Sequence, residues 1–200
     1  MKIIQARRNK RPNSVSGIGS TELTFEDGRV ETYSLIRGSI VWPHETFPGV
    51  ILLGAQRLDS DKVEILKEGL FSDMSGAVEI FQELWSYMPS CYYYREDPEG
   101  EAFVSFLRRS SELIGKLPIV AAPHTKAVEY GVQLIGKLLG EDRLEIPPGS
   151  TLATQLRESR WDTSAEEMYA VSALRYLLGG IEVYPYEQEL EEFNLESCFI

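Results

Sequence analysis

The sequence has 200 residues, of which 43% are hydrophobic and 26% are charged, and its formal net charge is −11 at pH 7. This length suits one domain with a hydrophobic core, and the negative charge argues against a protein that coats nucleic acid with its whole surface. No apolar run approaches the roughly 18 residues that a membrane span requires. Two cysteines and two histidines offer neither a disulfide framework nor a structural zinc site. With no secretory signal at the N-terminus, we expect an intracellular protein.

Charge is distributed unevenly along the chain. The basic residues near the start are Lys2, Arg7, Arg8, Lys10 and Arg11. Because residues that interrupt regular structure follow them, we expect residues 1–17 to form a flexible basic arm, which either binds an acidic partner such as nucleic acid or is only solvated. Residues 181–200 contain several glutamates and neither Lys nor Arg. We interpret this segment as a solvated acidic tail, so the predicted folded domain spans residues 18–180.

The segment between the arm and residue 70 has β-type patterns. The predicted strands are residues 21–25, 30–34, 39–42, 50–55 and 63–66. Asp27-Gly28 between the first two predicts a tight hairpin, because this dipeptide favours the turns that join antiparallel strands. We therefore expect the sheet to begin with antiparallel pairing.

The apolar period changes near residue 75, from two to about 3.6. The predicted helices are residues 75–88, 99–115 and 127–138, a short one that Ser150 caps, and a last one that Thr163 or Ser164 caps and that ends near Leu178. Short strands are predicted between them at residues 91–95, 118–121 and 144–146. This order predicts an α/β fold, in which a mixed sheet whose first three strands are antiparallel is flanked by helices.

Asp97 is the first candidate for a functional residue. It follows the predicted strand at residues 91–95, and Pro98 suits the first turn of the next helix. Sites collect at the carboxyl ends of strands in open α/β sheets, so Asp97 could be a metal ligand. The alternative is that Asp97 only caps the helix.

Four segments together resemble a known family. They are IRGSIVW at residues 36–42, CYYYREDPEG at 91–100, the segment 124–150 and WDTSAEEMYAVSALRY at 161–176. In this order they resemble the nuclease domain of the large terminase subunit of tailed bacteriophages, which has an RNase H-like fold. The resemblance covers residues 36–178.

The resemblance implies an acidic metal site that is incomplete in this chain. The first catalytic Asp of the family falls at or near Val41, the second falls at Asp97, and the acidic position on the closing helix falls near Glu167. Glu45 could contribute only if its loop folds back. RNase H-like nucleases hold two Mg²⁺ ions between such carboxylates, so the cofactor would be Mg²⁺ or Mn²⁺ if the chain is active.

The resemblance therefore implies three possible functions. The first is a catalytically degenerate nuclease-like domain with a structural, DNA-binding or assembly role in phage DNA packaging. The second is an active endonuclease that uses Asp97, Glu167 and Glu45, with Asp97 and Glu167 as metal ligands. The third is a module that binds capsid or other assembly proteins. Each implies a place in the host cytoplasm during phage assembly or in the virion.

Three consecutive tyrosines, Tyr92, Tyr93 and Tyr94, allow two interpretations. They could stack on the bases of a single nucleic-acid strand, because aromatic rings bind bases with little sequence preference. The alternative, which the short buried strand favours, is that they pack in the core and on the sheet.

Overall fold

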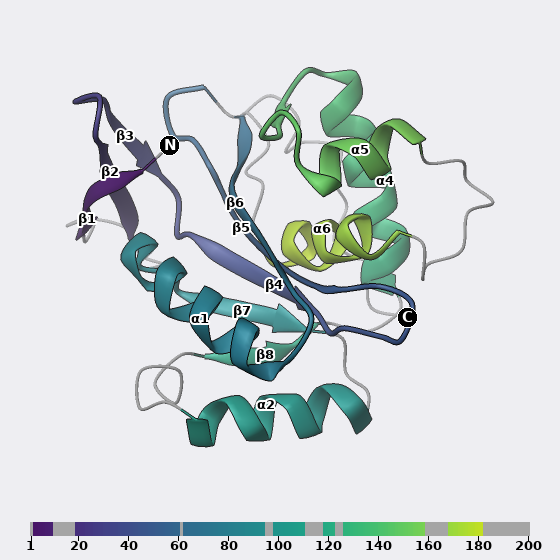
Figure 1. Ribbon diagram of the computed structural model, residues 1–200. Helices are drawn as coiled ribbons and strands as arrows, with labels where there is room; N and C mark the ends of the chain where they lie inside the picture. Colours follow the sequence, from purple (N-terminus) through teal and green to yellow (C-terminus); the bar gives the residue numbers. More distant parts are fainter. Residues whose placement is uncertain are drawn as a thin grey trace, which may run out of the picture.

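A computed structural model describes residues 2–9, 19–60, 62–94, 98–110, 118–122, 126–158 and 168–181. Six strands form the central sheet in the order β8-β7-β4-β5-β6-β9, and three more form a separate sheet in the order β1-β2-β3 (Figure 1). None of the helices in the described ranges is long and apolar enough to cross a membrane.

The central sheet is mixed, as predicted. Its strands are β4 (Arg37–Val41), β5 (Gly49–Gln56), β6 (Val63–Phe71), β7 (Cys91–Tyr94), β8 (Ile119–Ala121) and β9 (Leu144–Glu145). The first three pair antiparallel in chain order. Strand β7 is parallel to β4, β8 is parallel to β7, and β9 is parallel to β6. This confirms the predicted antiparallel start followed by α/β crossovers.

Helices cover both faces of this sheet. They are α1 (Met74–Leu84), η1 (Trp85–Tyr87), α2 (Pro98–Ser110), α4 (Lys126–Gly140), α5 (Thr151–Glu158) and α6 (Tyr169–Gly180). Strand β5 is buried along its whole length, because Ile51 and Leu53 pack in the cluster that contains α1 and α2. Val50 and Leu52 alternate with them and pack in the cluster of α4, α5 and α6. The core therefore has two layers, one on each face of the sheet.

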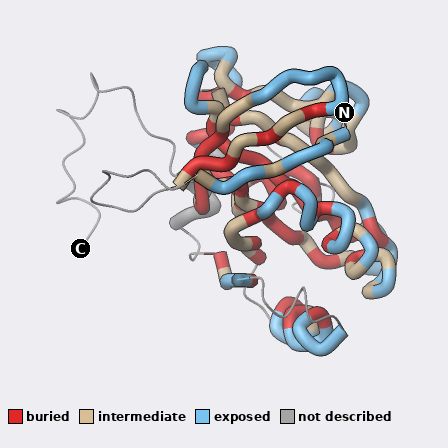
Figure 2. Tube along the Cα trace, turned by 90° about the vertical axis from the view of Figure 1, so that its left-hand side faces the viewer, coloured by how far each residue is buried: buried red, intermediate tan, exposed pale blue. Residues whose placement is uncertain are grey.

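The second sheet is antiparallel and includes a segment that we expected to be flexible. It consists of β1 (Ile3–Asn9), β2 (Ser20–Phe25) and β3 (Val30–Tyr33). Strand β1 pairs with β2 over six registered positions, and Arg8 donates to the Met88 carbonyl at 2.9 Å. The prediction of a flexible arm is therefore wrong for residues 3–9, although most of β1 is exposed (Figure 2). Lys10 and Arg11 lie outside the described residues.

Local sequence signals explain where several helices and strands begin or end. Gly28 turns the β2–β3 hairpin with φ +82°, which glycine adopts without steric cost. Ser150 caps α5, as predicted, because its Oγ accepts from the Ala153 N–H at 3.1 Å. Helix α1 ends at Leu84 and is followed by η1, which ends at Tyr87 because Met88 takes a left-handed conformation with φ 53°. The predicted caps Thr163 and Ser164 and the acidic tail from residue 182 lie outside the described residues.

Candidate functional site at the carboxyl edge of the sheet

The carboxyl ends of β4 and β7 meet at one edge of the central sheet. The two strands are parallel and Ile40 pairs with Tyr94, so their last residues, Val41 and Tyr94, lie close together at this edge. Helix α6 packs across β4, β5 and β7. Two parallel strand ends beside a helix are the arrangement in which α/β proteins place ligands.

Val41 occupies the position at which the resemblance expects the first carboxylate. Its side chain is partly buried and packs against the apolar cluster that α6 forms with β5 and β6. An aliphatic side chain cannot bind Mg²⁺, which prefers oxygen ligands. The described residues thus leave this position of a two-metal site without a ligand.

The structure does not describe two of the three acidic residues named from the sequence. Asp97 lies between the end of β7 at Tyr94 and the start of α2 at Pro98, and Glu167 precedes Met168, the residue before α6. Both are outside the described residues, so Asp97 keeps its two interpretations. Within the described part of the chain, no group of three or more His, Cys, Asp or Glu residues could hold a metal ion.

A role for Glu45 requires the loop after β4 to fold back toward α6. The loop does so, because the Phe47 ring stacks on the Tyr169 ring with centroids 5.4 Å apart and planes at 6°. Tyr169 is the first residue of α6. Glu45 itself is exposed. The loop that carries Glu45 therefore contacts the first residue of α6 through Phe47.

The three tyrosines of β7 pack in the protein and do not form an exposed platform. Tyr92 is fully buried and its ring lies edge-on to Phe81 at 4.8 Å, while Tyr94 is 4% exposed. The Tyr93 hydroxyl accepts from Arg37 at 2.9 Å, and burial raises the pKa of Tyr93 to about 12. The core interpretation is therefore confirmed and the base-stacking interpretation is wrong for these residues.

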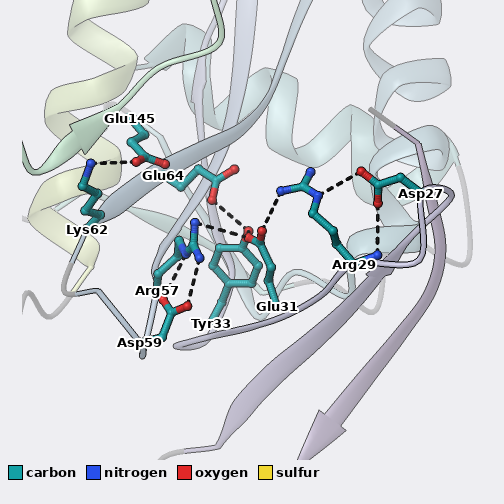
Figure 3. A network of polar contacts seen from close by, with 9 residues as sticks. All are labelled: Asp27, Arg29, Glu31, Tyr33, Arg57, Asp59, Lys62, Glu64 and Glu145. Atoms are coloured by element: carbon teal, nitrogen blue, oxygen red, sulfur yellow. Dashed lines mark hydrogen bonds and ion pairs between the residues drawn. The ribbon is translucent and has the colours of Figure 1, made fainter.

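A partly buried polar network, which the sequence did not predict, links the two sheets (Figure 3). The Tyr33 hydroxyl lies 2.6 Å from Glu31 Oε2 and 2.8 Å from Glu64 Oε2. Arg57 lies 3.7 Å from Glu31 and 2.9 Å from Asp59. Tyr33 belongs to β3 and Glu64 to β6, so the contact depends on how the sheets pack. The only sequence signal is that polar residues alternate with apolar ones in both strands.

Proton counting explains the electrostatics of this network. The Tyr33 hydroxyl has one proton and faces two carboxylates, so it can donate to only one of them. Burial, together with the neighbouring Glu31, raises the pKa of Glu64. Burial and the two carboxylates raise the pKa of Tyr33 as well. A protonated Glu64 could donate to the Tyr33 oxygen while Tyr33 donates to Glu31, which would satisfy all three groups.

A cavity of about 550 Å³ lies beside the network, between β6 and the loop that follows β9. Its acidic lining residues are Glu64, Glu68 and Glu145. Each already has a partner: Glu64 contacts Tyr33, Glu68 accepts from two backbone N–H groups at the start of α5, and Glu145 accepts from Lys62 at 2.9 Å. The carboxylates therefore serve the fold, and we assign no ligand to this cavity.

Two solved structures of phage proteins are similar to this one. The nuclease domain of g2p, the large terminase of bacteriophage SPP1, solved with bound Mn, matches with a TM-score of 0.59 and 14% identity, over 73% of this chain and 86% of that chain. The large terminase nuclease of thermophilic phage G20c, solved with bound zinc, matches with a TM-score of 0.53 and 13% identity, over 87% and 92%. This chain has the terminase nuclease fold.

The terminase nuclease fold confirms the resemblance that the four sequence segments indicated and the expected RNase H-like arrangement. At these identities the similarity establishes the fold, and the bound metals are those of the SPP1 and G20c proteins. Activity has to be argued from the site, because one fold serves many functions. No protein-family model matches the sequence, and no curated protein sequence matches it either.

Proposed function

We propose that this chain is a terminase nuclease-like domain of a phage DNA-packaging system that has lost catalysis. In this proposal it keeps a structural, DNA-binding or assembly role, in the host cytoplasm during phage assembly or in the virion. The observation that carries the proposal is Val41 at the end of β4, at the carboxyl edge, where a carboxylate shared by two metal ions is needed.

Two-metal catalysis depends on the carboxylate that is missing at Val41. Two ions about 4 Å apart stabilise both the attacking and the leaving oxygen of the phosphodiester. Each Mg²⁺ requires nearly octahedral oxygen ligands. Without a carboxylate at Val41, Asp97 and Glu167 could together hold one ion weakly with several waters. A second ion would lack a shared ligand, so the leaving oxygen would not be stabilised.

We expect the purified chain to show little or no cleavage of supercoiled plasmid with Mg²⁺ or Mn²⁺. An Asp97→Ala variant should fold normally, as measured by circular dichroism, and should change DNA binding little. The matched gain-of-function variant is Val41→Asp, which restores the missing carboxylate and should gain weak Mn²⁺-dependent nicking. Robust cleavage by the unmodified chain that Asp97→Ala abolishes would refute the proposal.

One observation favours the alternative of an active Mg²⁺- or Mn²⁺-dependent endonuclease. The loop that carries Glu45 lies against Tyr169, two residues after Glu167. Glu45 could then supply an oxygen ligand from the loop instead of from β4, with Asp97 and Glu167 as its partners. In this case plasmid cleavage should fall in a Glu45→Gln variant as well as in Asp97→Ala.

We further propose that the basic residues at the start of the chain bind an acidic partner, either DNA or another packaging or capsid protein. Lys2 is ion-paired with Glu26 at 3.4 Å but remains 79% exposed, and Arg7 is exposed on β1. Lys10 and Arg11 follow in the sequence. The first positive charges therefore lie just before and on an ordered strand, most of which is exposed.

Charge removal at Lys2 and at Arg7 of β1 tests this proposal without deleting a strand of the sheet. If the partner is DNA, a Lys2→Gln/Arg7→Gln variant should bind duplex DNA more weakly at low salt. The slope of log K against log salt should fall by about 2, because each phosphate contact contributes nearly one unit. An unchanged slope would exclude DNA contacts by these two residues and would favour a protein partner.

A further inference from the structure

We propose that His44, Phe47 and Tyr169 form an aromatic platform on which an unpaired base of single-stranded DNA stacks, at the carboxyl edge of the central sheet. The three rings belong to the β4–β5 loop and to the first residue of α6. The inference rests on the proposed DNA-binding role and names the form of DNA that this edge would bind. It does not depend on catalysis.

The three rings are stacked nearly parallel. The centroids of His44 and Phe47 are 5.3 Å apart with an interplanar angle of 20°. The centroids of Phe47 and Tyr169 are 5.4 Å apart with an angle of 6°. Such distances and small angles describe offset stacking, so each ring presents a face in nearly the same orientation. A base that stacks on the outer ring would continue the same series.

The platform is held in place before any ligand binds. The His44 N–H donates to the Phe47 carbonyl at 3.0 Å, and the Phe47 N–H donates to the His44 carbonyl at 3.3 Å. These two backbone hydrogen bonds close the loop between Pro43 and Pro48, and Tyr169 is anchored in α6. Little conformational entropy would therefore be lost when a base stacks on the rings.

Exposure distinguishes this stack from ordinary core packing. His44 is exposed, and Phe47 and Tyr169 are partly buried. The neighbouring stack of Trp42 on Phe103, with centroids 4.8 Å apart, is a packing contact because Trp42 is only 7% exposed. The His44 ring reaches solvent, so its contact with Phe47 buries little apolar surface. An exposed ring at a ligand-binding edge is therefore available for an external planar group.

Stacking as the main contact favours a single strand as the occupant. The net charge of −11 opposes the phosphates of both forms of DNA, so it does not distinguish between them. Base–aromatic stacking tolerates any base, because every base has a π-face. The bases of a duplex are already stacked on one another, so a single strand should bind better than the same sequence in a duplex.

Binding of a fluorescein-labelled oligothymidylate of about 12 nucleotides to the full chain, measured by anisotropy, tests this inference. His44→Ala should weaken binding roughly tenfold, which lies within the range for loss of one base-stacking contact. His44→Phe should retain the affinity because it retains a ring. The control is Trp85→Ala, which removes another exposed aromatic side chain from η1, the helix that leads into the amino end of β7.

A second readout locates the base directly. The chain has two histidines, so a His44→Phe comparison assigns the ring-proton NMR signals. Titration with the oligonucleotide should shift the His44 ring signals upfield, as a base over the ring face requires. No binding by the unmodified chain, equal affinity of His44→Ala, or unshifted His44 signals would overturn the inference. None of these results would alter the degenerate-nuclease proposal, which plasmid cleavage decides.

Discussion

Replacing Gly38 by alanine is expected to destabilise the fold by about 3 kcal/mol, at the upper end of the cost of overpacking a core. Gly38 lies in β4, between β5 and β7. A Cβ atom at this position would lie 2.2 Å from Cδ1 of Tyr92 and 3.1 Å from Cδ2 of Leu53. The Tyr92 ring is fully buried and packed edge-on against Phe81, so it cannot move aside. The added methyl group therefore has to displace a central strand.

Urea denaturation measures this effect, and Gly136→Ala is the matched control. Gly136 lies in α4 and is exposed, and no atom would lie within 4 Å of an added Cβ. Alanine has the higher helix propensity, so the same chemical change should stabilise the protein here by about 0.5–1 kcal/mol. Opposite signs at the two glycines are the expected result. Similar small effects at both would show that the Tyr92 ring has room to shift.

Replacing Glu64 by glutamine is expected to raise the free energy of unfolding at neutral pH and to change its pH dependence. Burial raises the pKa of Glu64 above its ordinary value of 4.5, so the folded protein binds a proton that the unfolded chain has already released. Stability then falls as pH rises from about 4.5 through the raised pKa. Glutamine stays neutral and can donate to the Tyr33 oxygen, so the variant should lack this fall.

The difference in unfolding free energy between the two proteins isolates this group from the other carboxylates. It should be smallest near pH 4 and should grow to a plateau above the raised pKa of Glu64. The control is Glu79→Gln, the same chemical change at an exposed position of α1, outside the Tyr33 network. A constant difference across the pH range would mean that Glu64 titrates alike in the folded and unfolded states.

The sequence predicted the elements whose signals are local. Asp27-Gly28 marked the β2–β3 hairpin, and the apolar period of residues 127–138 marked α4. Ser150 marked the start of α5. Each signal depends on residues within one turn or one helix, so it can be recognised without knowing the rest of the fold. The sequence also placed Val41 at the end of the first strand of the central sheet. It did so because residues 36–42 resemble the first core strand of the family.

Only the tertiary structure decided the contacts between distant residues. Strand β1 is basic and polar, and its order comes from pairing with β2 and from the bond of Arg8 to Met88, neither of which its own pattern predicts. The hydrogen bond between Tyr33 and Glu64 and the stack of Phe47 on Tyr169 join residues 31 and 122 positions apart. Such contacts form because the sheets and helices bring these side chains together, and their energies depend on burial and orientation that a linear sequence does not contain.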